Sequence, residues 1–362
     1  MPLDNTWVEV SESALLSNLR GLKSLLTSGT SLMFVVKANG YGHGLVWVAK
    51  TMNGATDAFG VSSVEEGIQL REAGITRPVC LLEGFFTPDE LPTLAEHRLE
   101  PAIHCEFQLQ ALVQALPVVK LTVWLKIDTG MHRLGFLPQA VPDVLKQLRS
   151  SPAVADIRVM SHFARADIRF DPDTKTQIES FQGQVRNLGL ESSLANSAGI
   201  LAWPQSHLDW VRPGIMLYGA SPMAGESAAA LDIEPVMTLE TALIAVNIRR
   251  QGEAIGYGGD WRCPEDMPVG VAAIGYGDGY PRHAVPGTPV LVNGKRVPLV
   301  GRVSMDMITL DLRAQPDARV GDPVVLWGQG LPVEEVAQSA GTIAYELLCH
   351  VTERIPRVVR KT

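Results

Sequence analysis

Cysteine is scarce in this chain of 362 residues, and no two cysteines stand close together. Cys80, Cys105, Cys263 and Cys349 form no Cys-x-x-Cys motif. This spacing argues against the usual zinc sites and against a disulfide framework, and free thiols are typical of a reducing compartment. We therefore expect four free cysteines and no bound metal.

Long apolar runs are also absent. No stretch approaches the ~20 residues that a helix needs to cross a bilayer. The first five residues, Met-Pro-Leu-Asp-Asn, lack the basic start and the apolar core of a secretory signal. The sequence therefore predicts a soluble, cytoplasmic protein with no membrane partner.

Basic clusters are missing except near the C-terminal end. The formal net charge is −8 and the pI is near 5.5. The short stretch 354–361 contains the one local excess of Arg and Lys, and we interpret it as a solvated end. Because a phosphate backbone attracts blocks of positive charge, this distribution argues against a nucleic-acid partner.

Short apolar runs, by contrast, are abundant. Hydrophobic residues make up 46% of a chain that is longer than one average domain, so we expect two domains. Helix-like segments separate the runs, such as residues 63–71 and the helix start Thr87-Pro88. This alternation favours a (β/α)8 TIM-like barrel over residues 11–231, although a doubly wound sheet alternates similarly. The expected strands are 32–36, 58–61, 79–82, 101–103, 121–127, 157–160, 193–195 and 211–217.

Polar groups stand at or just beyond the ends of several of these runs. Barrel enzymes build their sites at the C-terminal ends of the strands, so this position marks candidates for chemistry. The candidates are Lys37, Glu83, His104, Asp128, His162, Asn196, Ser197 and Arg212.

After about residue 231 the pattern changes to closely spaced strands. Asn293-Gly294 lies between the apolar runs 289–292 and 297–300, which is typical of a two-residue hairpin. Two helices are expected at 332–339 and 345–351. The sequence therefore predicts a second, mainly β domain over residues 232–362.

The run Val-Val-Lys-Ala-Asn-Gly-Tyr-Gly-His-Gly around Lys37 is the most informative feature. A lysine in a partly desolvated barrel mouth can lose its proton and form a Schiff base with an aldehyde cofactor. From position alone, a lysine that keeps its ammonium in water is the open alternative. Small residues and backbone N–H groups at the other strand ends can cradle one phosphate. The residues of this cradle are Tyr41, Asn196, Ser197, Arg212, Gly214 and Ile215.

Over its whole length the chain resembles the bacterial alanine racemases, which use pyridoxal 5′-phosphate (PLP). Seven ordered motifs carry the resemblance, and such a set is not expected by chance. They occupy residues 36–44, 126–135, 161–164, 211–215, 256–259, 275–280 and 304–307.

The resemblance implies a two-base reaction. Lys37 would hold PLP and act as the base on one face of the substrate, and Tyr257 would act on the other face. In the family, the residue that matches His162 helps the tyrosine to act near neutrality, and it contacts the residue that matches Arg212. A permanently charged arginine at the pyridine nitrogen keeps that nitrogen unprotonated, which weakens the electron sink and suits racemisation. A structural ion pair of Arg212 with Asp209 or a nearby carboxylate is the alternative.

The resemblance also assigns the carboxylate end of the site. Arg133 would orient the substrate carboxylate, and Lys126 matches a lysine that is often carbamylated to fix that arginine. A carbamate would replace a cation by an anionic acceptor beside Arg133. An ordinary lysine paired with Asp128 is the alternative.

Residues of the second domain complete the implied site. Met305 and Asp306 would border the substrate, and Asp167, Tyr276 and Arg302 would line the access path. In relatives, Tyr257, Tyr276, Arg302, Met305 and Asp306 reach the site of the partner subunit, so a homodimer is implied. The strand 6–10 is implied to join the β domain.

Two departures from the family pattern stand out. Many relatives carry a phosphate-contacting tyrosine where this chain has Glu353, and we expect Glu353 to point away from the phosphate. Gly40 replaces the usual alanine, which should loosen the loop slightly.

The leading hypothesis is an alanine racemase that supplies D-alanine for peptidoglycan. The alternatives are a racemase of broader specificity, a PLP-dependent amino-acid decarboxylase of the same architecture, and a non-catalytic PLP-binding module. Arg212 disfavours the decarboxylase, because decarboxylation favours an acidic partner for the ring nitrogen. The second domain disfavours the module, which is a single barrel.

Overall fold

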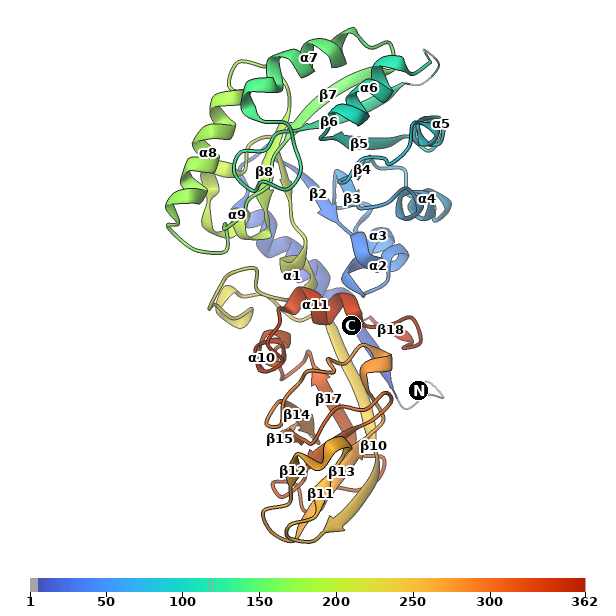
Figure 1. Ribbon diagram of the computed structural model, residues 1–362, viewed down its shortest axis with the longest axis vertical. Coiled ribbons are helices and arrows are strands. Elements are labelled where there is room, and N and C mark those ends of the chain that lie inside the picture. The colour runs from blue at the N-terminus through green and yellow to red at the C-terminus, as the bar shows by residue number, and fades with distance from the viewer. Residues whose placement is uncertain (1–5, 117, 119, 362) are drawn as a thin grey trace.

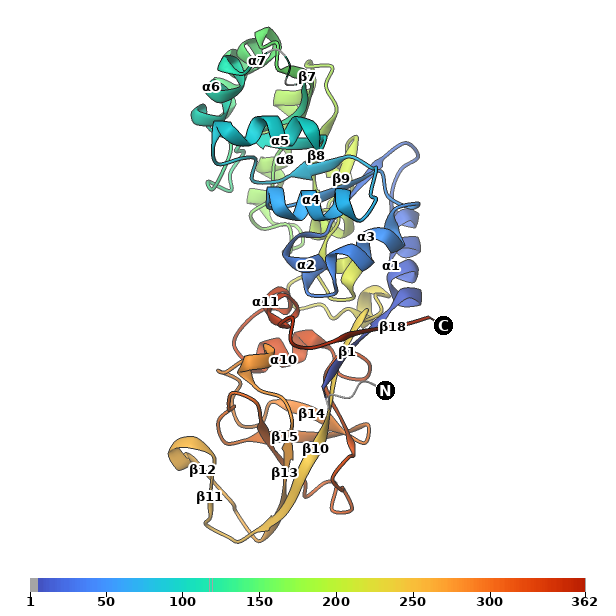
Figure 2. The same cartoon turned by 90° about the vertical axis from the view of Figure 1, so that its right-hand side faces the viewer.

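Two units stack along the long axis of the molecule, a parallel barrel at one end and a β domain at the other (Figure 1, Figure 2). The computed structural model describes residues 6–361 apart from 117 and 119. The last barrel strand ends at Arg212 and the first long strand of the β domain begins at Met237. The boundary between residues 231 and 232 stays a prediction.

Eight parallel strands close the barrel, because β2 pairs with β9 as well as with β3. This closure confirms the TIM-like barrel and rules out the doubly wound sheet. The strands are β2 Ser31–Val35, β3 Ala58–Val61, β4 Val79–Leu81, β5 Leu99–Ile103, β6 Leu121–Lys126, β7 Val154–Met160, β8 Ser192–Asn196 and β9 Trp210–Arg212.

One predicted strand is too long. The run 211–217 was expected to be a single strand, but β9 ends at Arg212 and a 3₁₀ helix covers Ile215–Tyr218. Pro213 has no N–H group to donate to a neighbouring strand, and Gly214 follows it at φ −130° and ψ −100°. The strand therefore stops at the arginine, which leaves Arg212 at the barrel mouth.

Helices surround the barrel and bury apolar residues three and four positions apart. In α7, the residues Val141, Val144, Leu145 and Leu148 face the core. Helix α4 begins as predicted, with Ser63 accepting a hydrogen bond from the backbone of Glu66. The helices are α1 Glu12–Leu25, α3 Leu45–Met52, α4 Val64–Glu72, α5 Leu91–Glu96, α6 Glu106–Gln114, α7 Val141–Ser150, α8 Pro172–Val185 and α9 Ser197–Ala202.

The β domain is a mostly antiparallel sheet in which both ends of the chain take part. Strand β1 pairs antiparallel with β10 and parallel with β18, and an additional pairing of β10 with β13 curls the sheet onto itself. Its strands are β1 Trp7–Ser11, β10 Met237–Arg249, β13 Met267–Ala272, β14 Pro289–Val292, β15 Lys295–Val300, β16 Ile308–Asp311, β17 Pro323–Trp327 and β18 Arg357–Arg360.

The predicted hairpin and helices of this domain are confirmed. Asn293 and Gly294 both have positive φ, at 50° and 75°, and connect β14 to β15. The helices are α10 Val333–Ser339 and α11 Ala344–His350, and α11 lies at the junction with the barrel beside α2, Lys37–Tyr41 (Figure 1). No helix within residues 6–361, as far as they are described, is long and apolar enough to cross a membrane.

A small arm projects from the β domain (Figure 2). It consists of β11, Ala254–Ile255, and β12, Trp261–Arg262, with a 3₁₀ turn at Tyr257–Gly259 between them. Tyr257 therefore lies at the outer end of the arm.

Candidate active site

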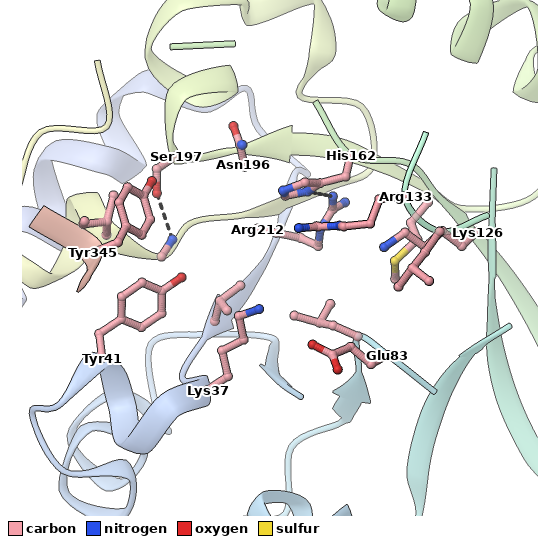
Figure 3. Close-up of a pocket in the computed structure, with 16 residues that line it drawn as sticks. Lys37, Tyr41, Glu83, Lys126, Arg133, His162, Asn196, Ser197, Arg212 and Tyr345 are labelled. Carbon is pink, nitrogen blue, oxygen red and sulfur yellow. Dashed lines mark hydrogen bonds between the residues drawn. The ribbon is translucent and has the colours of Figure 1, made fainter. Parts of the chain in front are cut away.

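A cavity of about 470 Å³ opens at the C-terminal ends of the barrel strands (Figure 3). Most of the strand-end residues singled out from the sequence line it, whereas His104 and Asp128 do not. The lining residues are Val35, Lys37, Tyr41, Leu82, Glu83, Lys126, Arg133, Leu134, Met160, His162, Asn196, Ser197, Arg212, Gly214, Ile215 and Tyr345.

Lys37 follows β2 and begins an unusual turn. Residues 38–41 all have positive φ, at 54°, 54°, 61° and 51°, so α2 is largely one turn of left-handed helix. The side chain of Lys37 points into the cavity (Figure 3). No hydrogen bond or ion pair occupies its amine within the described part of the chain. The amine is thus available to a ligand in the cavity.

The turn also carries Tyr41 to one end of the cavity. The Tyr41 ring is buried and stacks on Tyr218, with 4.6 Å between the ring centroids. Burial raises the pKa of Tyr41 far above its usual value, so the phenol stays protonated and can donate a hydrogen bond. Tyr218 was not singled out from the sequence, and its hydroxyl donates to the carbonyl of Val35 at 3.0 Å.

Small residues leave room for a ligand beside Tyr41. A Cβ atom at Gly214 would lie 2.6 Å from the Tyr41 hydroxyl, so only glycine leaves this space open. The Gly214 N–H donates to the Ser197 hydroxyl at 2.9 Å (Figure 3), which leaves the Ser197 hydrogen free to donate to another group. Asn196 accepts from the backbone of Gly199 at 2.9 Å and caps α9. This end of the cavity therefore has the donors that a phosphate needs.

Tyr345 completes this end and was missed from the sequence. It comes from α11 in the other domain, and its ring centroid lies 6.1 Å from that of Tyr41. The phosphate-contacting tyrosine was sought instead at the position of Glu353, which is exposed and does not line the cavity. The signal that could have revealed Tyr345 was a tyrosine as the first residue of the predicted helix 345–351.

Arg212 forms the back of the cavity. One guanidinium nitrogen donates to the Ser193 hydroxyl at 2.6 Å, and the other donates to the Ser161 carbonyl at 2.5 Å and to His162 Nδ1 at 3.3 Å. Burial lowers the pKa of Arg212 to about 10, so the group stays charged near neutrality. The expected alternative of an Asp209 ion pair is wrong, because Asp209 accepts from the backbone and hydroxyl of Ser192.

His162 is neutral in this setting. Burial and then the charge of Arg212 lower the pKa of His162 well below its usual value. Since an arginine can only donate, Nδ1 of His162 accepts and the hydrogen of the ring is on Nε2.

Lys126 and Arg133 lie at the opposite end of the cavity. Burial, followed by the charges of Arg212 and Arg133, lowers the pKa of Lys126 to about 8. The alternative of a pair with Asp128 is wrong, because that carboxylate accepts from the backbone of Gly130 and His132 at 3.0 Å. Over the residues that the structure describes, the Lys126 amine has no hydrogen-bond or ion-pair partner.

The charges in the cavity favour an anionic ligand. Four cationic side chains, those of Lys37, Lys126, Arg133 and Arg212, face one carboxylate, that of Glu83. A phosphorylated aldehyde fits this set, since phosphate donors lie at one end and an unpaired lysine amine lies between them and the arginines.

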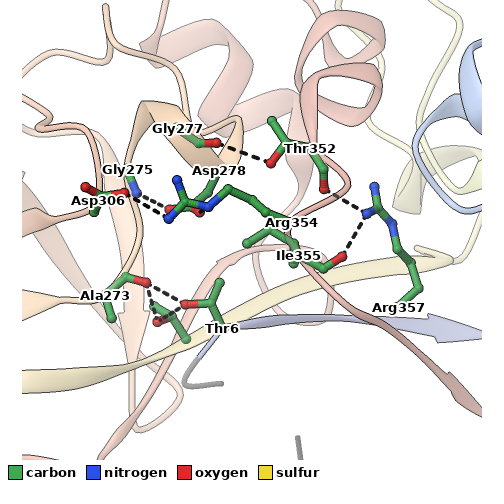
Figure 4. A network of polar contacts seen from close by, with 11 residues as sticks. Thr6, Ala273, Gly275, Gly277, Asp278, Asp306, Thr352, Arg354, Ile355 and Arg357 are labelled. Carbon is green, nitrogen blue, oxygen red and sulfur yellow. Dashed lines mark hydrogen bonds and ion pairs between the residues drawn. The ribbon is translucent and has the colours of Figure 1, made fainter. Parts of the chain in front are cut away.

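The candidates of the second domain lie outside this cavity. Tyr257, Tyr276 and Met305 are exposed, with 68%, 42% and 54% of their surface accessible. Arg302 forms an ion pair with Asp260. A separate group gathers around Arg354, which contacts Asp306 at 2.9 Å and Asp278 at 3.1 Å (Figure 4).

Asp167 lines a neighbouring cleft of about 450 Å³. This cleft shares Asn196 and Tyr345 with the main cavity. A ligand in the cleft would therefore lie directly beside the proposed phosphate end.

A closed parallel barrel whose mouth holds an unpaired lysine, a phosphate cradle and a buried arginine defines the class of barrel enzymes that carry PLP on a lysine. Comparison with known proteins identifies the family within this class. The family described as "Alanine racemase, N-terminal domain" matches residues 10–222, and its C-terminal counterpart matches residues 236–359. The chain belongs to the alanine racemase family.

Individual relatives agree with this assignment over nearly the whole chain. An alanine racemase of Nitrosococcus oceani is 55% identical over 351 residues, which cover 97% of this chain and 98% of the relative. One of Vibrio parahaemolyticus is 52% identical over 344 residues, covering 95% and 96%. The crystal structure of the biosynthetic alanine racemase of Pseudomonas aeruginosa superposes with a TM-score of 0.95 at 44% identity, covering 99% and 100% of the two chains.

Proposed function

We propose that this chain interconverts L-alanine and D-alanine, with Lys37 and Tyr257 as the two bases. Family membership makes it a PLP-dependent isomerase. The observation that carries the residue assignment is the buried, charged Arg212 at the back of the lysine cavity. We further propose that the enzyme acts in the cytoplasm and supplies D-alanine for peptidoglycan.

The cofactor would be held from three sides. Tyr41, Ser197, Tyr345 and the backbone around Gly214 and Ile215 would bind its phosphate, and Lys37 would bind its aldehyde carbon. Arg212 would face the ring nitrogen, with His162 as the neutral acceptor behind it. When bound, PLP supplies the electron sink that makes the Cα–H bond of alanine acidic.

Racemisation needs a proton acceptor on one face of Cα and a donor on the other. Lys37 Nζ would take or give the proton on one face, and Tyr257 Oη of the partner subunit would do so on the other. The usual pKa of tyrosine is near 10, and each unit below that value corresponds to about 1.4 kcal/mol. To act as a base near neutrality, Tyr257 therefore needs a neighbour that stabilises its ionised form. We propose that His162 and the charge of Arg212 behind it supply this stabilisation.

Arg133 would bind the substrate carboxylate at the other end of the cavity. We propose that Lys126 is carbamylated there, because its buried amine is unpaired and is held next to two arginines. The carbamate would accept from the Arg133 fork and remove the repulsion between the two cations.

A homodimer would bring the remaining residues to the site. The arm with Tyr257 projects from the molecule, and Tyr276 and Met305 are exposed, so a second copy can receive all three (Figure 2). We propose that Met305 and Asp306 of the partner subunit border the substrate. Asp167 would line the access path together with Tyr276 and Arg302 of the partner subunit.

The direct test is racemisation of alanine with purified enzyme and PLP, followed with a D-amino-acid oxidase. Lys37→Ala should lose both covalent attachment of PLP and racemisation, whereas Tyr257→Phe should keep PLP and lose racemisation. A yellow, active Lys37→Ala protein would refute the lysine assignment. Release of carbon dioxide from lysine, ornithine or diaminopimelate would favour a decarboxylase, and faster turnover of lysine or arginine would favour a broader racemase.

Mixing the two inactive variants tests the shared site. In a dimer of one Lys37→Ala chain and one Tyr257→Phe chain, one site lacks both bases and the other has both. Random exchange makes about half of the dimers mixed, so about one quarter of wild-type activity should return. No recovery after verified subunit exchange would show that each site is built from one chain.

A further inference from the structure

The left-handed turn of residues 38–41 is a strained element at the centre of the site. Three of its four residues, Ala38, Asn39 and Tyr41, have a side chain, and a positive φ is unfavourable for each of them. Such a conformation persists only where the surroundings hold it. The polar groups that hold this turn therefore decide where Lys37 and Tyr41 point.

Two side-chain hydrogen bonds tie the turn to neighbouring helices of the barrel. Glu66 accepts from the backbone N–H of Ala38 at 2.7 Å, and Asn39 accepts from that of Leu45 at 2.9 Å. Both partners belong to the barrel. Backbone N–H groups of residues 42–44 donate to the carbonyls of Ala38, Asn39 and Gly40. The carbonyls of Tyr41 and Gly42 receive side-chain donors.

His43 donates to two of these carbonyls. Its Nδ1 lies 2.8 Å from the oxygen of Tyr41 and 3.2 Å from that of Gly40. The ring is completely buried, and burial lowers the pKa of His43 to about 4, so the ring is neutral and its single N–H is on Nδ1. Its Nε2 has no hydrogen-bond partner in the described structure.

A buried nitrogen without a partner is costly, and an apolar ring would avoid that cost. The fold nevertheless has a histidine here, with its one donor directed at the two carbonyls. This arrangement indicates that the Nδ1 hydrogen bonds stabilise the turn, and that the histidine does more than fill space with its ring.

Arg357 reaches the next carbonyl from the other domain. Its Nε donates to the oxygen of Gly42 at 3.1 Å, and its terminal nitrogens donate at 2.8 Å to the carbonyls of Val351, Thr352 and Ile355 (Figure 4). Among the described residues no carboxylate forms an ion pair with it. Four of its five N–H donors are therefore engaged, three within the C-terminal segment and one at the carbonyl that follows the lysine turn.

Gly42 shows how closely the two segments approach. A Cβ atom at this position would lie 2.0 Å from the carbonyl oxygen of Leu348, in α11. The backbone that follows the turn therefore packs directly against the backbone of α11. A shift of α11 would therefore move the residue that follows Tyr41.

We propose that His43 and Arg357 are positioning residues for racemisation, which hold the left-handed turn so that Lys37 and Tyr41 face the cofactor. The proposal rests on the function proposed above. Neither residue lines the cavity, so each acts through the turn.

The experiment compares variants with a matched control. Arg357→Gln removes the guanidinium fork, and Arg357→Lys keeps the charge without the fork. His43→Phe keeps a ring without a donor, whereas His43→Asn keeps an N–H near the Nδ1 position. The control is Arg71→Gln, because Arg71 also donates to four carbonyls, those of Ile75, Arg77, His97 and Arg98, away from the cavity.

Three quantities are measured for each protein: the melting temperature, the dissociation constant of PLP from the absorbance of lysine-bound cofactor, and kcat on alanine. Arg357→Gln and His43→Phe should raise the PLP dissociation constant at least about tenfold, and Arg357→Lys should lie between Arg357→Gln and the wild type. His43→Asn should recover most of the loss. Arg71→Gln should lower the melting temperature with PLP affinity within about twofold of the wild type.

The proposal is overturned if Arg357→Gln and Arg71→Gln change melting temperature and PLP affinity alike, or if His43→Phe binds PLP as tightly as the wild type. If Arg357→Gln does not fold, the His43 pair decides the outcome. A wild-type enzyme that binds PLP but does not racemise alanine would refute the proposed function, and PLP affinity would still test the positioning role.

Discussion

Replacing Lys126 with methionine should stabilise the cofactor-free protein near pH 7. The lysine side chain is only 8% exposed, and no carboxylate compensates its charge in the described structure. Methionine keeps an unbranched apolar stem of similar length and removes the charge. The change therefore isolates the cost of a buried ammonium next to Arg133 and Arg212.

The magnitude follows from the pKa. The value falls from 10.5 to about 8 in the folded protein, which corresponds to about 3 kcal/mol at about 1.4 kcal/mol per unit. Between these two values the unfolded chain binds more protons than the folded chain, so wild-type stability rises with pH in that window. The advantage of Lys126→Met should therefore be about 3 kcal/mol near pH 7 and about 1 kcal/mol near pH 9.5.

The assay is guanidinium unfolding of both proteins without PLP, in buffer free of carbon dioxide and at equal subunit concentration. The exposed Lys146 provides a control, and Lys146→Met should change stability by less than about 0.5 kcal/mol. Added bicarbonate should stabilise the wild type and leave Lys126→Met unchanged, because only an amine forms a carbamate. A variant that is less stable than the wild type near pH 7, or an advantage that grows with pH, would refute the reasoning.

Three further predictions concern the cavity and its walls. Arg212→Gln should lower the free energy of unfolding by about 1–3 kcal/mol, since buried acceptors lose their donor. It should also raise the yield of pyruvate from alanine relative to racemisation, and an unchanged product ratio would contradict the proposed effect of Arg212 on the cofactor ring. Gly42→Ala should abolish stable folding, as judged by thermal melting, because its Cβ would meet Leu348, whereas Gly29→Ala at φ 94° meets no atom within 4 Å and should leave a folded protein. Tyr345→Phe should raise the PLP dissociation constant roughly tenfold, because one phosphate donor is lost. Equal affinity of the variant and the wild type would show that this hydroxyl does not bind the phosphate.

Much of the fold could be predicted because most of the barrel strands are buried along nearly their whole length. Runs such as 58–61 have to be continuously apolar when both of their faces are covered. The strand-end polar residues were informative for the same reason, since Lys37 and Arg212 interrupt these runs at the barrel mouth. The overextended strand at 211–217 arose because apolar residues continue beyond Pro213 into a 3₁₀ helix that is also buried.

Other parts of the site could not be predicted, because they depend on contacts between distant segments. Tyr345 reaches the cavity only because α11 packs beside the lysine turn. Local propensity opposes the left-handed conformation of Ala38 and Asn39, and one partner of this turn, Glu66, lies 28 residues further along the chain. The suggested pair of Lys126 with Asp128 failed because the carboxylate binds the backbone of its own loop, a common alternative for aspartate.

The pairing of the two chain ends in one sheet has a consequence for biosynthesis. β1 pairs with β10 and β18, so Val8 lies beside Arg357 across almost the whole length of the chain. A ribosome adds about 5–20 residues per second from the N-terminus, so β1 remains without its neighbour β18 until residues 357–360 have been made. The barrel strands, which close within residues 31–212, can assemble earlier. The lysine turn gains its contact with Arg357 only after that residue has been made, and a product that stops before Arg357 should therefore bind PLP poorly.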